Sequence, residues 1–237
     1  MSTRSTIARL ALGLAVSLSV ASGQSSYVPT ISAQAFRHPI SRKAHKTLQK
    51  VTDYYFAGND EAMQNQLQRA MEMPDAAPYA LKIKGLLNLN HKDVAAAQNE
   101  LQHAATALPW DAEAQALLAY ALYCGNDLAP GADTAYKALE VDSNQPLAHL
   151  VIALVQLDTH QVESGLPHLR KAANLGLLPA QVLLANYYAL TGQPELAEQT
   201  WRQARAAPSQ IRDRRVRQDT MRWLERHQAF SQTSSPH

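Results

Sequence analysis

The residues of this chain that could do chemistry are few and scattered. There is one cysteine, Cys124; among the nine histidines, His160 and His168 lie eight residues apart and His149 stands alone. The zinc motif His-Glu-x-x-His, the nucleophile turn Gly-x-Ser-x-Gly and the phosphate loop Gly-x-x-x-x-Gly-Lys do not occur in the sequence. A single cysteine also excludes a Cys-x-x-Cys metal site. We therefore predict that the protein is not an enzyme and needs no cofactor or metal.

The remaining reactive groups are expected to have structural roles. We expect the histidines on the surface or in loops, and Cys124 as a buried, unreactive thiol; an intermolecular disulfide through Cys124 is the alternative. The pair Asp60-Glu61 is typical of a solvated helix start with Asp60 at the N-cap. Helices must position all these groups, because Ala, Leu and Gln dominate the sequence and no segment alternates with a period of two.

Alanines recur every 34 residues at Ala70, Ala104, Ala138 and Ala172. A fixed period of this length is typical of helix–turn–helix units stacked into a solenoid. In the same register the eighth residue of a unit is mostly small, as at Gly85 and Ala185, and the twenty-fourth is mostly large, as at Leu101 and Trp201. Alternating small and large residues favour interdigitating packing of neighbouring helices. Turn signals between the two helices of a unit fall in phase with this period at Gly58-Asn59, Gly125-Asn126 and Gly192-Gln193.

The pattern resembles the tetratricopeptide repeat (TPR) family over roughly residues 44–211, and units 78–111 and 178–211 match it best. The junction 172–176 and the residues after it also resemble the related Sel-one-like repeats. The resemblance implies an all-α fold, a right-handed α-solenoid of about five helix–turn–helix units. It also implies a non-enzymatic scaffold that binds protein partners.

In the TPR family the first helix of each unit lines the concave face. Carried onto this chain, the positions that point there form an apolar and aromatic groove, and the predicted protein-binding residues are Tyr55, Tyr79, Lys82, Leu86, Leu89, Tyr120, Tyr123, Leu150, Leu154 and Asn186. Such a groove suits an amphipathic helix or an extended apolar peptide. Lys82, Asn90 and Asn186 do not form the clamp with which some members hold a chaperone's C-terminal carboxylate. The alternative is a groove filled by the chain itself, through residues 27–40 or the last helix.

The N-terminus has the layout of a secretory signal peptide. Arg4 and Arg9 precede the apolar run 10–21, and a small-residue cleavage site follows at 21–23, with 33–35 as a second candidate. An uncleaved weak anchor and an organelle transit peptide are the alternatives. We predict an exported protein of the periplasm or cell envelope.

Charge is distributed unevenly along the chain. Residues 1–50 hold seven Lys or Arg and no acid, residues 51–200 hold seven against seventeen acids, and residues 201–237 hold eight Arg against three acids. The last predicted helix has an apolar face with Trp223 and a basic patch at Arg212, Arg214, Arg215, Arg217 and Arg222. We expect it to cap the solenoid, since terminal repeats need a polar outer face. Its basic patch could instead contact an anionic membrane or an acidic protein.

The predicted organisation is a signal peptide at 1–23, a flexible lead-in at 24–43, the solenoid at 44–211, a basic capping helix at 212–230 and a disordered tail at 231–237. The predicted function is a non-enzymatic scaffold in the envelope or periplasm that binds an apolar helix or peptide of a protein partner in its groove. The competing hypothesis is an adaptor that uses the Arg-rich helix. The export signal argues against nucleic acid as a partner.

Overall fold

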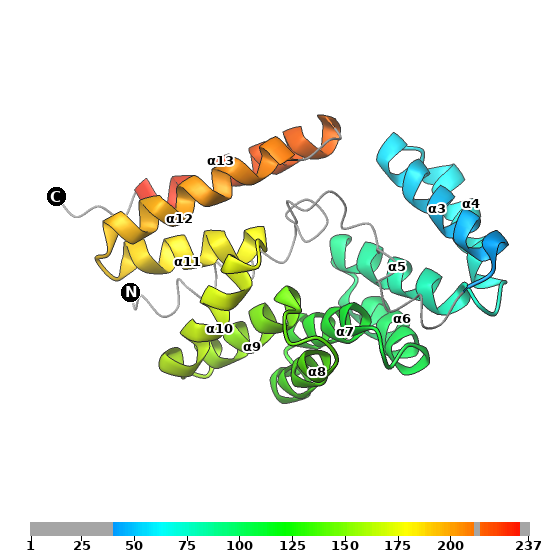
Figure 1. Cartoon of the computed structure of the whole chain (residues 1–237), viewed down its shortest axis with the longest axis horizontal. Coiled ribbons are helices and arrows are strands. Elements are labelled where there is room, and N and C mark those ends of the chain that lie inside the picture. Colours follow the sequence, from blue (N-terminus) through cyan, green and yellow to red (C-terminus); the bar gives the residue numbers. More distant parts are fainter. Residues whose placement is uncertain (1–39, 211–213, 233–237) are drawn as a thin grey trace. The chain divides into compact units, whose positions relative to one another are not determined.

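The computed structural model describes residues 40–210 and 214–232, where every regular element is helical, as predicted (Figure 1). The described chain falls into two compact units, with the boundary between Ala148 and His149. The first unit holds α3 (Arg42–Ala57), α4 (Asp60–Met71), α5 (Ala77–Asn90), α6 (Val94–Ala107), α7 (Ala112–Cys124) and α8 (Leu128–Val141). The boundary lies in α9 (Pro146–Asp158), and the second unit continues with α10 (Val162–Asn174), α11 (Leu178–Leu190), α12 (Pro194–Ala206), the 3-10 helix η3 (Ala207–Gln210) and α13 (Arg214–Gln232).

The 34-residue period of the sequence is also the period of the helices. The second helices of the first four repeats begin 34 residues apart, and α12 begins two residues early, at Asp60, Val94, Leu128, Val162 and Pro194. Each alanine of the ladder is completely buried, at Ala70, Ala104, Ala138 and Ala172. A methyl group at these positions lets neighbouring helices approach closely. The predicted repeat is therefore confirmed.

The turns inside the repeats share one backbone conformation although their residues differ. Positive φ angles between 64° and 68° recur every 34 residues at Gly58, Lys92, Asn126 and His160. Only one of these four residues is glycine, the type that adopts this conformation without strain. In the last repeat Gly192 has the equivalent conformation, with φ at 74°. The packing of the two helices therefore determines the turn more strongly than the residue type at its centre.

The N-caps of the second helices follow directly after these turns. Asn59 caps α4 by accepting a hydrogen bond from the Ala62 amide at 3.1 Å, and Asp93 caps α6 through the Ala96 amide at 3.1 Å. Placing the cap of α4 at Asp60 was wrong by one residue, because Asn59 already has the non-helical backbone that a cap requires. Asp60 instead lies in the first turn of α4, where its charge favours the helix N-terminus.

Small and large residues meet between the two helices of a repeat, as the sequence predicts. A Cβ atom placed on Gly85 of α5 would lie 2.8 Å from the Leu101 Cδ2 atom of α6. Real Cβ atoms do not approach other side chains so closely, so only glycine fits without movement of Leu101. Leu101 itself is completely buried. The small eighth position and the large twenty-fourth position therefore form one contact in this repeat.

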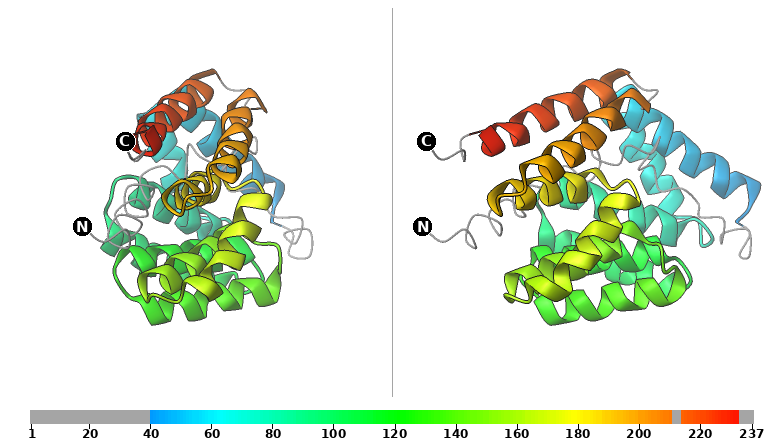
Figure 2. Two further views of the ribbon diagram at one scale, coloured as in Figure 1. Left: turned by 90° about the vertical axis from the view of Figure 1, so that its left-hand side faces the viewer. Right: turned by 60° about the vertical axis from the view of Figure 1, so that its left-hand side comes forward.

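In the second compact unit, α11 packs against α10, α12 and α13. Figure 2 shows α13 running alongside α12. Trp223 and Leu224 of α13 are buried, as is the hydroxyl-bearing Thr220. The buried face predicted for this helix is thus confirmed at Trp223, and the first two residues of the predicted cap range of 212–230 lie outside the described part of the chain.

Several predicted segments lie outside the described residues: the signal peptide at 1–23, most of the lead-in at 24–43, and all but two residues of the tail at 231–237. Within the described part, none of the helices has both the length and the apolar character needed to cross a bilayer.

Candidate functional site

The predicted groove residues fall into two sets, one in each compact unit. The first set lies on α3, α5 and α7, and the second on α9 and α11. Nine of the ten are less than 9% exposed, namely Tyr79, Lys82, Leu86, Leu89, Tyr120, Tyr123, Leu150, Leu154 and Asn186. Tyr55 is half-buried beside the core of the first unit. All the predicted groove side chains except that of Tyr55 are therefore nearly closed to solvent in this structure.

Lys82 is the centre of a buried ion cluster that joins α5 to α7. Its Nζ atom lies 2.8 Å from a carboxylate oxygen of Asp111 and 2.8 Å from one of Glu113. The lysine side chain is completely buried, and those of Asp111 and Glu113 are 2% and 14% exposed. The other oxygen of Asp111 accepts from the backbone amides of Glu113 and Ala114, so Asp111 also caps α7. One cation and two carboxylates give the cluster a net charge of −1.

The cluster keeps its lysine charged. Burial by itself would lower the Lys82 pKa, but the charges of Glu113 and Asp111 and their hydrogen bonds outweigh that cost and raise the pKa. Burial raises the Glu113 pKa, and the Lys82 charge opposes this only in part. The Lys82 ammonium therefore has a local structural function between α5 and α7, and it is not a titrating acid or base.

Aromatic side chains lie on the same two helices as this cluster, and Tyr79 is next to its lysine. The Lys82 ammonium lies 5.9 Å from the centre of the Tyr79 ring, and burial followed by the Asp111 charge raises the Tyr79 pKa. On α7 the rings of Tyr120 and Tyr123 stack with their centres 6.4 Å apart.

Cys124, at the end of α7, is a free and partly exposed thiol. Burial raises its pKa to about 11, although a hydrogen bond with Tyr120 partly opposes this. A thiol with such a pKa stays protonated at neutral pH and is a poor nucleophile. This agrees with the predicted lack of reactivity, but the prediction that Cys124 is buried was wrong, since its position at the end of α7 leaves it partly exposed.

Two histidines of the second unit meet, which the sequence did not indicate. The Nδ1 atoms of His149 on α9 and His168 on α10 are 2.9 Å apart, and the ring centres are 5.1 Å apart. His149 is buried and His168 is half-buried. Placing these two on the surface or in loops was wrong, because α9 and α10 fold back on each other and bring them together. His160, in contrast, lies in the turn between α9 and α10, as expected.

Asn186 on α11 differs from every other predicted groove residue. It is 3% exposed, and neither its Oδ1 nor its Nδ2 atom has a hydrogen-bond partner. Val182, one turn earlier on the same face, is completely buried. Leaving both a donor and an acceptor unpaired costs about 1–3 kcal/mol for each buried group. An unpaired buried amide of this kind calls for an explanation, and a ligand is one of the few that physical chemistry offers.

The predicted basic patch is described only in part. Arg212 lies outside the described residues, and the side chains of Arg214 and Arg215 on α13 are not described. Arg217 is half-buried, and Arg222 is exposed and forms an ion pair with Asp219. The described part of the chain contains no group of three or more side chains suited to hold a metal ion.

Two solved structures resemble this helical arrangement. The crystal structure of TTC0263, a thermophilic TPR protein in Thermus thermophilus, matches with a TM-score of 0.60 at 18% sequence identity, over 76% of this chain and 98% of that chain. The crystal structure of MamA matches with a TM-score of 0.50 at 14% identity, over 67% of this chain and 94% of that chain. No protein-family model matches the sequence. No curated protein matches it either.

The likeness to these structures shows the fold. The chain is a TPR-like helical repeat protein with an all-α solenoid fold, which confirms the predicted fold class. The Sel-one-like features remain a prediction.

Proposed function

We propose that this protein is a non-enzymatic scaffold that binds a helix or an extended peptide of a protein partner. Proteins of the TPR-like fold are typically scaffolds of this class, in agreement with the predicted lack of enzymatic activity. The observation that carries the proposal is the buried amide of Asn186, which has no hydrogen-bond partner at either atom.

The chemistry of Asn186 suits a peptide backbone. A carboxamide offers a donor and an acceptor side by side, and a peptide group offers the complementary pair. The completely buried Val182, one turn earlier on α11, would supply apolar surroundings in which such hydrogen bonds are strong. A partner that satisfies both atoms of Asn186 would recover the free energy that the unbound protein loses there.

Binding at these residues requires an opening, because the predicted groove side chains are almost completely buried. A protein that binds only from a minor open state has an apparent affinity lowered by the population of that state. We therefore propose that association is slow compared with docking onto a preformed surface. The unpaired Asn186 reduces the cost of the opening, because exposing it to water restores its hydrogen bonds.

Selection of binders from a random peptide library, followed by affinity measurements on the full chain, tests the proposal. The binding peptides should lose at least about tenfold in affinity on Asn186→Leu, which keeps the side-chain shape but removes both hydrogen-bonding atoms. Asn99→Leu on α6 is the matched control, since Asn99 is exposed and lies outside the predicted groove. Equal affinity of wild type and Asn186→Leu would refute a role for Asn186.

We also propose that the protein is exported to the periplasm or envelope, on the strength of the apolar run 10–21 and the basic residues before it. Sequencing the N-terminus of the protein isolated from host envelope fractions tests this. A new N-terminus near residue 24 or 36 would support export, and an intact N-terminus on protein confined to the cytosol would contradict it.

A further inference from the structure

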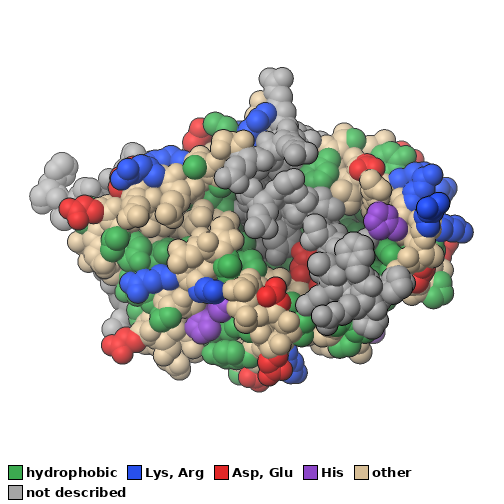
Figure 3. Space-filling view, in the orientation of Figure 1, with side chains coloured by type: hydrophobic (Ala, Val, Ile, Leu, Met, Phe, Trp, Pro, Cys, Tyr) green, Lys and Arg blue, Asp and Glu red, His purple; other side chains and the backbone are tan. Residues whose placement is uncertain are grey.

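A cleft lies between α3 and α4 in the first unit. It has a volume of about 420 Å³ and is lined by Lys43, Lys46, Thr47, Lys50, Gln66, Arg69, Glu72 and Met73. A volume of this size falls within the range of small-molecule sites. Figure 3 shows Lys and Arg side chains gathered at this edge of the unit. The scaffold function proposed above makes no use of this cleft.

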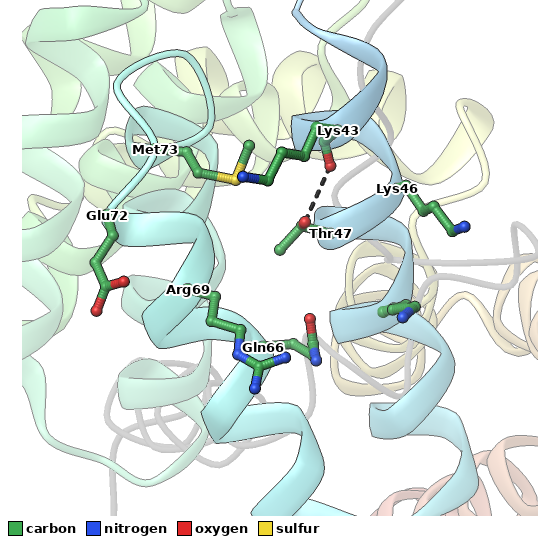
Figure 4. A pocket seen from close by; sticks show the side chains of 8 residues that line it. Lys43, Lys46, Thr47, Gln66, Arg69, Glu72 and Met73 are labelled. Carbon is green, nitrogen blue, oxygen red and sulfur yellow. Dashed lines mark hydrogen bonds between the residues drawn. The ribbon is translucent and has the colours of Figure 1, made fainter.

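The charge of the cleft has one predominant sign. Four cationic side chains line it against a single acid, Glu72. The ion pairs between described residues include none of Lys43, Lys46, Lys50 and Arg69. In Figure 4, Glu72 is turned away from the space between the helices. A terminal repeat needs a polar outer face for solubility, but mixed charges would meet that need equally well.

Lys43 of α3 and Arg69 of α4 face the space between the two helices, whereas Lys46 points away from it in Figure 4. Lys43, Lys46 and Lys50 follow the spacing that places them along one side of α3. Figure 4 shows Lys43 extending across to Met73, and Gln66 and Arg69 lying between the helices from the α4 side. The stretch of α3 from Lys43 to Lys50 is about 10 Å long at 1.5 Å per residue. That length accommodates a ligand with two or three anionic groups.

We propose that this cleft binds a compact polyanion that carries phosphate groups. The Arg69 guanidinium can donate two parallel hydrogen bonds to phosphate oxygens, and the lysine ammonium groups supply mobile point charges around it. The amide of Gln66 adds a neutral donor. The ligand is either a soluble phosphorylated molecule or the headgroup of an anionic lipid, since both present the same chemistry.

Titration calorimetry of the full chain with inorganic tripolyphosphate at low ionic strength tests the proposal. We expect saturable binding that weakens as salt is added, because exposed charges are screened. Lys43→Gln with Arg69→Gln should weaken binding at least about tenfold. The matched control is Lys137→Gln with Lys171→Gln, which removes two exposed lysines of α8 and α10 and should leave binding unchanged. Circular dichroism of each variant confirms that the helical content is kept.

Vesicles of phosphatidylcholine and phosphatidylglycerol in equal parts distinguish the two sources. Binding to tripolyphosphate and vesicles, both lost in Lys43→Gln with Arg69→Gln and both kept in Arg217→Gln with Arg222→Gln, identifies a headgroup site. Binding to tripolyphosphate alone identifies a soluble ligand. The proposal is overturned if the cleft variant and its control behave alike, or if a polyglutamate peptide binds and tripolyphosphate does not. Peptide binding that depends on Asn186 would be unaffected by either result.

Discussion

Lys82 on α5 and Asn186 on α11 are two nearly solvent-free polar side chains with opposite surroundings. Lys82 is completely buried and is held by two carboxylates at 2.8 Å. Asn186 is 3% exposed, and both of its polar atoms lack a partner. Both lie on the first helix of a repeat, and the sequence predicted both as groove residues.

The number of hydrogen-bond partners distinguishes Lys82 from Asn186, whereas their exposed fractions do not, because both are nearly zero. A buried ammonium held by two carboxylates stabilises the contact between the helices that supply them, and two of its three N–H donors are already used. A buried amide without partners reduces stability and keeps its full hydrogen-bonding capacity. Two predicted groove residues on the first helices of different repeats can therefore have different roles, and their hydrogen-bond partners distinguish the two roles.

The largest loss of stability is expected where a substitution breaks the buried ion cluster of Lys82. Lys82→Met leaves Asp111 and Glu113 buried with no cation, so the free energy of unfolding should fall by about 3–5 kcal/mol. Urea denaturation followed by circular dichroism measures this. Glu113→Gln is the matched comparison, because Asp111 still pairs with Lys82 and the net charge of the cluster becomes zero. We expect a clearly smaller loss there, because no uncompensated charge is left buried; equal losses in the two variants would contradict a central role for Lys82.

A smaller effect is expected where the same helix, α5, packs through apolar contacts. In Gly85→Ala the new methyl group meets Leu101, so the free energy of unfolding should fall by about 1–3 kcal/mol despite the better helix propensity of alanine. Ala185 on α11 already has a methyl group at this repeat position. Adding Leu101→Ala to Gly85→Ala should cost less than the sum of the two single changes. Additive losses would show that the two residues do not share one contact.

The smallest effect concerns the histidine pair of the second unit. Burial, and then the positive charge of His149, lowers the His168 pKa below its usual value near 6.5. The unfolded chain therefore binds a proton more readily than the folded one, so stability falls as pH drops below about 6.5. Melting curves from pH 8 to 5 should show a greater loss for wild type than for His168→Gln. Parallel curves would mean that His168 does not contribute to the pH dependence.

The sequence predicted most of the fold because the information is local and periodic. The alanine ladder, the turns at Gly58 and Gly192 and the offset of the last repeat all follow from residue spacing. Where the prediction missed, the cause was backbone geometry. The N-cap of α4 is Asn59, one residue before Asp60, which the sequence predicted as the cap. The positive φ at Lys92 has no glycine to signal it.

The candidate sites were less predictable, because their contacts join distant residues. The ion pair of Lys82 with Asp111 spans 29 residues, and the contact of His149 with His168 spans 19. Repeat position placed Lys82 and Asn186 in one class, and only the three-dimensional structure separates the paired one from the unpaired one. The excess of basic residues before Asp53 was visible in the sequence, but the contribution of Arg69 from α4 to the same cleft was not.

The most direct test of this account is to measure stability and peptide affinity together for Asn186→Leu. If Asn186 is an unpaired amide kept for a ligand, the substitution raises the free energy of unfolding by about 1–3 kcal/mol and weakens the selected peptides at least about tenfold. If Asn186 is instead a structural residue, stability falls and peptide affinity stays at the wild-type value. That second result would contradict the central claim that α11 holds a polar group for a protein partner.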